Sequence, residues 1–219
     1  MENRKVKNLV DAGQTVRVEL TDGTALSLDV ETVVRLRLQV GTPVDDAMEA
    51  EMMAEERIAR AYRRALFFLS YRPRSTWEVE MDLKRRGLSE EAEAVITRLT
   101  QEGYLSDAEF ARMWVRERLR QGKRSRRHIA FELHEKRVPT EWIEKALQAV
   151  DDETELHTAL HLGRRYIKGK GRDVYRTLGY LKGRGFSHDV VETVGRMLRM
   201  ELMERFDDQG TDDDGQVNE

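Results

Sequence analysis

Hydrophobic and polar residues alternate along residues 15–28, and Asp22-Gly23 interrupts the alternation near its middle. An Asp-Gly pair between two alternating runs is typical of the tight turn of a β-hairpin. The pattern therefore predicts a hairpin over this stretch. The hairpin has to pack on other elements, because an isolated hairpin is marginal in water. Asp29 is then expected to cap a short helix over 31–39 that ends at Gly41.

Beyond Pro43 the apolar residues recur every three or four positions almost to the end of the chain, which is the spacing of amphipathic helices. The stretch 45–56 holds six acidic residues and no basic one. Carboxylates stabilise the N-terminal end of a helix through its dipole. A long helix is expected to begin here and to end before Pro73, since a residue that precedes proline disfavours the helical conformation.

The next segment carries the signals that begin and end short helices. Ser75 and Glu78 have the spacing of a capping box, in which each side chain accepts a hydrogen bond from the other residue's amide. Gly87 supplies the left-handed residue that ends this helix. Ser89 is expected to cap a further helix that ends near Gly103. One long and two short helices are therefore predicted before the chain repeats itself.

The capping signal recurs twice, at Ser125 and at Asp173, 50 and 48 residues further along the chain. Each anchor has equivalent apolar residues at the same distances before and after it, which are Ala61, Ala111 and Ala159; Leu69, Leu119 and Ile167; Leu83, Leu133 and Leu181; and Leu88, Val138 and Phe186. The sequence thus predicts a mainly α fold of three tandem three-helix repeats in an elongated arrangement, with a small N-terminal β-hairpin extension.

The middle repeat departs from the other two where its second helix ends. Gly87 and Gly185 supply the left-handed residue in the first and third repeats, but the middle repeat has Arg137. A left-handed arginine costs about 1 kcal/mol, so this turn is expected to close differently. The predicted divisions of the chain are 1–44 for the hairpin with its helix, 45–105, 106–150 and 151–204 for the three repeats, and 205–219 for an acidic disordered tail.

Charge is strongly segregated, although the net charge is only -3. Residues 112–137 hold ten Lys or Arg against three Glu, and residues 164–185 hold eight against one Asp. Residues 201–219 hold eight acids against one Arg. Solvated helix faces are one explanation of such runs. A surface for a polyanion or an acidic groove is the other, and the recurrence of a basic loop in all three repeats favours it.

No catalytic constellation is legible in the sequence. His157 and His161 share a helix face, but the glutamate of a metalloprotease motif is missing after the first histidine. The stretch 169–172 lacks the residues of a phosphate-binding loop. Phe110 and Trp114 are expected to bury into their helical unit rather than to stack on bases. We therefore expect neither an enzyme nor a cofactor.

The chain has no cysteine and no run of about 18 apolar residues, so a cytoplasmic protein without membrane contact is expected. A monomer is expected as well. The candidate binding residues are basic and lie in or beside the loops of the three repeats. They are Arg72, Arg74, Arg112, Arg116, Arg120, Lys123, Arg124, Arg126, Arg127, Arg164, Arg165, Lys168, Lys170, Arg172 and Arg176.

Three stretches resemble the bacterial RecX regulatory proteins, which modulate the recombinase RecA: ALFFLSYRPRSTWEVEMDLKRRG, GYLSDAEFARMWVRERLRQGKRSRRHIAFELHEKRV and YLKGRGFSHDVV. The resemblance spans about residues 58–200. It departs at Arg137-Val138-Pro139, where many members have Gly-Ile after a lysine. The hairpin resembles an N-terminal extension that only some members carry.

The resemblance implies a non-enzymatic regulator. Members of the family bind in the helical groove of the RecA–DNA filament, inhibit its ATPase and strand exchange, and can promote filament disassembly; many also bind DNA. Arginine suits carboxylates on a recombinase and phosphates equally well. The sequence therefore leaves open a second function, a stand-alone DNA-binding protein that uses the same basic residues.

Overall fold

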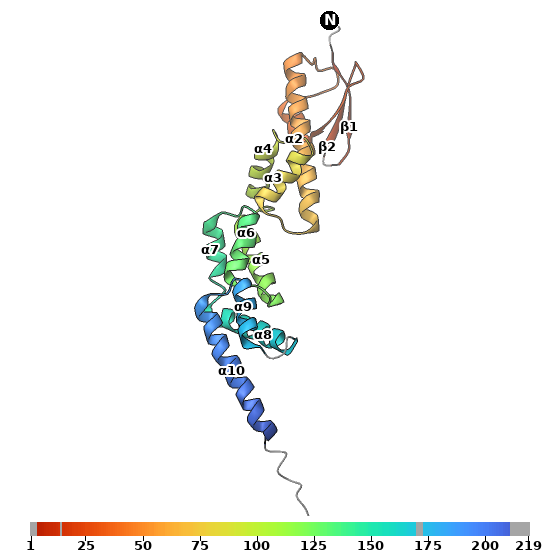
Figure 1. Cartoon of the computed structure of the whole chain (residues 1–219). Coiled ribbons are helices and arrows are strands. Elements are labelled where there is room, and N and C mark those ends of the chain that lie inside the picture. Colours follow the sequence, from red (N-terminus) through yellow and green to blue (C-terminus); the bar gives the residue numbers. More distant parts are fainter. Residues whose placement is uncertain (1–3, 14, 170–172, 211–219) are drawn as a thin grey trace, which may run out of the picture. The chain divides into compact units, whose positions relative to one another are not determined.

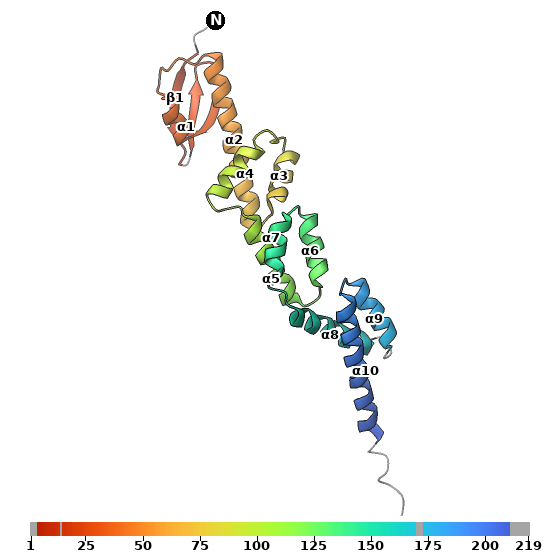
Figure 2. The ribbon, with the colours of Figure 1, turned by 90° about the vertical axis from the view of Figure 1, so that its left-hand side faces the viewer.

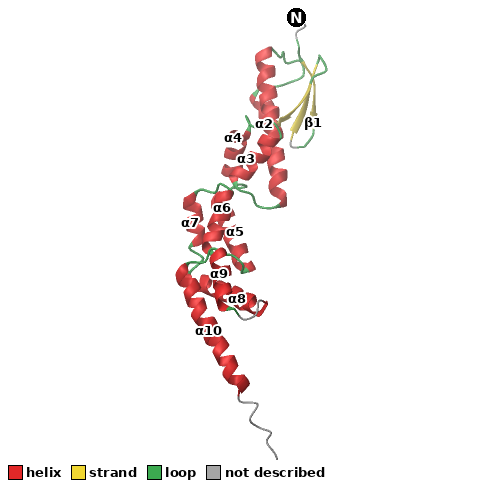
Figure 3. Cartoon of the chain, in the orientation of Figure 1, coloured by secondary structure: helices red, strands yellow, loops and turns green. Residues whose placement is uncertain are grey.

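The computed structural model of the chain describes residues 4–13, 15–169 and 173–210 (Figure 1). The chain forms two compact units, Met1–Ser106 and Asp107–Glu219. The first unit contains a small sheet and one three-helix repeat, and the second contains two three-helix repeats (Figure 3). The predicted mainly α fold is confirmed.

The sheet has three antiparallel strands in the order β1 (Val6–Asp11), β2 (Thr15–Leu20) and β3 (Ala25–Asp29). The predicted hairpin is confirmed as β2 and β3, which pair Val18 with Leu26 across a turn at Gly23. The strand β1 was not predicted. Its register against β2 shifts between Val6 and Asn8, and only Val6 is buried, so the sequence lacks a clean alternation there.

The helix after the sheet is shorter than predicted. Helix α1 spans Val30–Arg35, and the side chain of Asp29 makes no capping hydrogen bond. The chain leaves the helix through Arg37, which adopts a left-handed φ of 50°, and the turn at Gly41 is a separate one. The predicted end at Gly41 is wrong because the chain reverses earlier, which buries Leu38 in the sheet core.

The three helices of the first repeat are α2 (Asp46–Tyr71), α3 (Thr76–Arg85) and α4 (Ala92–Gln101). Asp45 caps α2, and Arg72 is extended, so both predicted ends are confirmed. Ser89 was expected to cap α4 but does not. Its backbone carbonyl accepts from the Ala92 amide in a turn, and the helix begins only at Ala92.

Helix α2 contributes to two hydrophobic cores. Met48 and Met52 near its start pack with the sheet, whereas Ala61 and Ala65 pack with α3 and α4. Helix α2 therefore belongs to both the sheet core and the core of the first repeat. The predicted boundaries at 44/45, 105/106, 150/151 and 204/205 stay predictions.

The second unit consists of α5 (Asp107–Gln121), α6 (Arg126–Glu135) and α7 (Thr140–Leu147), followed by α8 (Asp152–Gly169), α9 (Val174–Gly183) and α10 (His188–Gly210). Figure 2 shows these two groups of three helices. Each group has its own hydrophobic core. Helix α10 continues to Gly210, beyond residue 205, where the predicted tail begins. Residues 211–219 lie outside the described part of the chain.

The repeat predicted from Ser75, Ser125 and Asp173 is confirmed. All three residues are the N-caps of the second helix of their repeat, and each side-chain oxygen accepts from the amide three residues later. The capping box of Ser75 with Glu78 is present. The aligned alanines of the first helices and the aligned leucines of the second helices are completely buried, whereas Leu69 and Leu119 are partly buried.

The second helix also ends in the same way in every repeat. In the first repeat the Leu88 amide donates to the carbonyl of Leu83, and the middle repeat repeats this bond from Val138 to Leu133. Arg137 takes the left-handed φ of 55° that glycine takes in the other two repeats. The expectation of a different closure is therefore wrong, because burial of Val138 outweighs the backbone strain.

The strain at Arg137 predicts that Arg137→Gly stabilises the protein by about 0.5–1 kcal/mol, since glycine adopts this conformation without a steric penalty. Urea unfolding monitored by circular dichroism measures the change. Arg137→Ala is the matched control, because it removes the exposed side chain and keeps the left-handed Cβ. A glycine variant no more stable than the alanine variant would contradict the argument.

Candidate binding surface

The predicted arginine stripe on α5 is largely paired within its own helix. Arg112 lies 2.5 Å from the Glu109 carboxylate, and Arg120 makes two hydrogen bonds of 2.9 Å to Glu117. Hydrogen bonds from Arg120 and Gln121 lower the pKa of Glu117 to about 2. The exposed side chain of Arg116 lies between these pairs.

A half-buried carboxylate, Glu132, binds several basic residues of the second repeat. Glu132 on α6 accepts hydrogen bonds from Trp114 Nε1 at 2.8 Å and from Arg118 Nε at 2.5 Å, and Arg124 lies 3.4 Å away. Burial disfavours the charged form of Glu132, but these donors outweigh burial and hold its pKa below the usual value. Phe110 is buried and Trp114 packs against the core, as predicted. Arg124 is therefore partly neutralised by its own repeat.

The two arginine candidates of the first repeat serve that repeat's own packing. Arg72 donates to Glu78 at 2.8 Å and to the carbonyl of Pro73. The guanidinium of Arg74 lies 3.9 Å from the ring centroid of Phe68, and burial followed by repulsion from Arg72 lowers its pKa. The basic Pro-Arg-Ser turn thus holds the helix start together.

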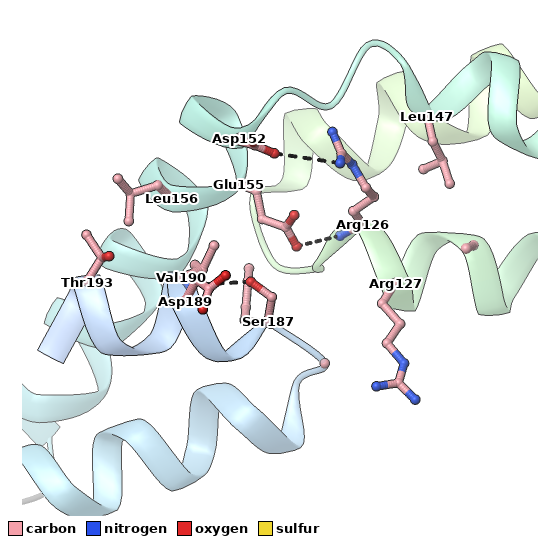
Figure 4. A pocket seen from close by; sticks show the side chains of 13 residues that line it. Arg126, Arg127, Leu147, Asp152, Glu155, Leu156, Ser187, Asp189, Val190 and Thr193 are labelled. Atoms are coloured by element: carbon pink, nitrogen blue, oxygen red, sulfur yellow. Dashed lines mark hydrogen bonds and ion pairs between the residues drawn. The ribbon is translucent and has the colours of Figure 1, made fainter.

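Arg126 joins the second repeat to the third. Its backbone amide donates to Glu155 at 3.1 Å, and its guanidinium donates to the carbonyl of Val150 and lies 3.7 Å from Asp152 (Figure 4). Arg126, Asp152 and Glu155 line a cavity of about 730 Å³ whose apolar lining includes side chains of α6, α7, α8 and α10. The side chain of Arg127 extends away from these carboxylates.

In the third repeat, some of the candidate residues form internal ion pairs and others do not. Arg164 makes hydrogen bonds of 2.6 and 3.1 Å to Glu201, which raise the pKa of the guanidinium, and Arg176 lies 3.1 Å from Asp173. Arg165 is exposed. Lys170 and Arg172 lie outside the described residues.

Within the described part of the second unit, five candidates are exposed and make no side-chain hydrogen bond or ion pair: Arg116, Lys123, Arg127, Arg165 and Lys168. Each of these five side chains could bind an external carboxylate or phosphate without first breaking an internal interaction. Sequence reasoning overlooked the acids three residues before Arg112 and Arg120, although that spacing is a recognisable signal for pairing.

The two histidines of the suspected metal motif, His157 and His161, lie within the described residues. There, no group of three or more His, Asp or Glu side chains lies close enough to hold a metal ion, so His157 and His161 do not form part of one. Across the same residues, no helix is both long and apolar enough to cross a membrane.

Two family models match the helical repeats. Residues 61–99 match the first three-helix domain of RecX, and residues 106–147 match the second. A Lactobacillus johnsonii regulatory protein RecX is 32% identical over 191 residues, which cover 84% of this chain and 70% of the relative. A Bacillus subtilis protein of the same name is 31% identical over 83% of this chain and 71% of its own length.

Solved structures show the same fold. A crystal structure of regulatory protein RecX superposes with a TM-score of 0.77 at 22% identity and covers 87% of this chain and 98% of its own. The crystal structure of RecX from Lactobacillus salivarius gives a TM-score of 0.62 at 22% identity over 66% of this chain and 98% of its own.

Because Glu132 binds several donors, Glu132→Gln is expected to destabilise the protein by about 1–3 kcal/mol at pH 7. A carboxyl group whose pKa is lowered by folding stabilises the native state above its unfolded pKa, and this contribution is lost as the pH falls through the native pKa. The difference between wild type and variant should therefore shrink in acid. Urea unfolding from pH 7 to pH 3 measures it.

Glu144→Gln provides the control for this series, since Glu144 is exposed on the neighbouring helix α7. A destabilisation by Glu132→Gln that is the same at both pH values would contradict an electrostatic role for the carboxylate.

Proposed function

The chain belongs to the family of RecX regulatory proteins, and from this premise we propose that it binds in the helical groove of a RecA–DNA filament and inhibits or remodels the filament. The protein modulates homologous recombination and DNA repair in this way, as a cytoplasmic monomer that catalyses no reaction itself and needs no cofactor.

The observation that carries the proposal is the set of exposed cations without internal partners. Arg116, Lys123 and Arg127 come from the second repeat, and Arg165 and Lys168 from the third. Cations of this kind gain charge-assisted hydrogen bonds when they meet carboxylates of a partner protein. The paired arginines gain less, because an existing ion pair has to be broken first.

A stand-alone DNA-binding protein is the second candidate function, because the same cations bind phosphates equally well. It requires tight binding to naked duplex DNA, with a logarithmic salt dependence near 0.9 per phosphate contacted. Weak binding of naked DNA at physiological salt would exclude it and would leave the recombinase as the partner.

The DNA-dependent ATPase of the cognate recombinase, measured while this protein is titrated, tests the leading proposal. Wild-type protein is expected to inhibit at well below one molecule per recombinase protomer. The triple variant Arg116→Gln, Arg127→Gln and Lys168→Gln should inhibit at least about tenfold more weakly, since each cation contributes to binding at no internal cost.

The matched control is the triple variant Arg112→Gln, Arg120→Gln and Arg176→Gln. It removes the same net charge from the same unit, but each of its arginines is paired with an acid three residues earlier. Equal weakening by both triple variants would show that only net charge matters. No inhibition by wild-type protein at a several-fold excess would overturn the proposal.

A further inference from the structure

The three repeats carry different residues at one equivalent position of their second helix. The residue seven places after the N-cap of this helix is Asp82 in the first repeat, Glu132 in the second and Tyr180 in the third. In the first two repeats this residue is a carboxylate that neutralises an arginine of the first helix: Arg64 binds Asp82 at 2.6 and 2.8 Å, and Arg118 binds Glu132. The third repeat has no acid there.

A stacked aromatic pair takes its place in the third repeat. The rings of Tyr166 on α8 and Tyr180 on α9 lie 4.3 Å apart between centroids, and their planes are 15° from parallel. Both rings line a cavity of about 370 Å³. The exchange of a carboxylate for a ring removes the internal negative charge and leaves a flat apolar surface.

Three cations line the same cavity. Lys123 comes from the turn after α5, Arg165 from α8 and Arg184 from the end of α9. The guanidinium of Arg184 lies 5.0 Å from the ring centroid of Tyr180. Among the described residues, none of the three side chains forms a hydrogen bond or an ion pair with another residue.

Three like charges around one cavity repel each other unless an anion lies between them. The first two repeats supply that anion from their own chain, as Asp82 and Glu132. In the third repeat it has to come from another molecule. A phosphate accepts hydrogen bonds from several arginine and lysine side chains at once, and is therefore a suitable anion.

The aromatic pair narrows the choice of ligand. A carboxylate or an inorganic phosphate would leave the tyrosine rings unused, whereas a nucleobase stacks on an aromatic side chain with a gain of about 1–3 kcal/mol. The cavity volume also falls within the range of about 300–1,000 Å³ that is typical of small-ligand sites. Base and phosphate together match both halves of the lining.

We propose that this cavity is a site for one nucleotide unit, with its base stacked against the Tyr166–Tyr180 pair and its phosphate held by Lys123, Arg165 and Arg184. The unit is either a free nucleotide or one nucleotide of a single strand. The proposal does not rest on the recombinase as partner, because the ligand meets only this chain.

Fluorescence anisotropy of a labelled oligothymidylate of about twelve nucleotides, titrated with the full-length protein, tests the proposal. The triple variant Lys123→Gln, Arg165→Gln and Arg184→Gln should bind at least about tenfold more weakly, with a salt slope smaller by about 0.7 for each phosphate that the variant no longer neutralises. Tyr166→Leu should weaken binding by about five- to a hundredfold, whereas Tyr166→Phe keeps the ring and should bind like wild type.

Competition with unlabelled thymidine monophosphate identifies the source of the nucleotide. Displacement of the oligonucleotide supports a site that takes free nucleotides, and a lack of displacement supports a site for a strand. The variant Arg112→Gln, Arg120→Gln and Arg176→Gln is the control of equal charge. Circular dichroism melting establishes that every variant is folded.

Three results would overturn the proposal. One is the absence of oligonucleotide binding by wild-type protein. Another is equal weakening by the control triple variant, which would indicate non-specific charge attraction. The third is a failure of binding on removal of the cations but not on Tyr166→Leu. That result would indicate a site that binds an anion without stacking a nucleobase, as expected for an acidic peptide segment.

Discussion

The capping of the second helix by a side-chain oxygen is the interaction on which each repeat depends. Ser75 and Ser125 are completely buried, and their hydroxyls satisfy amides that would otherwise lie unpaired inside the protein. Ser125 has a further role, since its hydroxyl donates at 2.9 Å to the carbonyl of Arg184 in the third repeat. A Cβ on Gly185 would lie only 3.0 Å from that hydroxyl oxygen, so a side chain here would lack space in addition to the strain of its φ of 83°. One atom thus begins a helix and joins two repeats.

One polar or aromatic residue of the second helix determines how the surface charge differs among the three repeats. Each second helix faces its first helix through one polar or aromatic position, and the side chain there determines whether nearby cations are neutralised. Asp82 and Glu132 neutralise arginines of their own repeats, while Tyr180 does not. The fold therefore persists while the charge that each repeat presents to other molecules changes.

Much of the fold could be predicted from the sequence because its signals are local. The capping residues at 75, 125 and 173, the Asp-Gly turn and the residue before Pro73 each depend on neighbours within a few positions. The strand β1 could not be predicted, since its pairing is irregular and its partner lies beyond a turn. Arg137 misled the sequence reasoning because burial of a neighbouring valine, a tertiary effect, decides its conformation. The internal pairing of the basic residues could be predicted only in part for the same reason: Arg126 and Arg164 find partners on other helices, Glu155 and Glu201, which spacing cannot reveal.

Helix α2 places two cores on one continuous rod of 26 residues, about 39 Å long. Met52, which faces the sheet, and Ala61, which faces α3 and α4, are nine positions apart and therefore point to nearly opposite sides of the helix. Removal of the sheet would leave a row of methionines in water along the first turns of a helix that the first repeat still requires. A chain of this family without the sheet would have to start the helix later or place polar residues on that side. The N-terminal extension and the repeat consequently constrain each other's evolution through a single secondary-structure element.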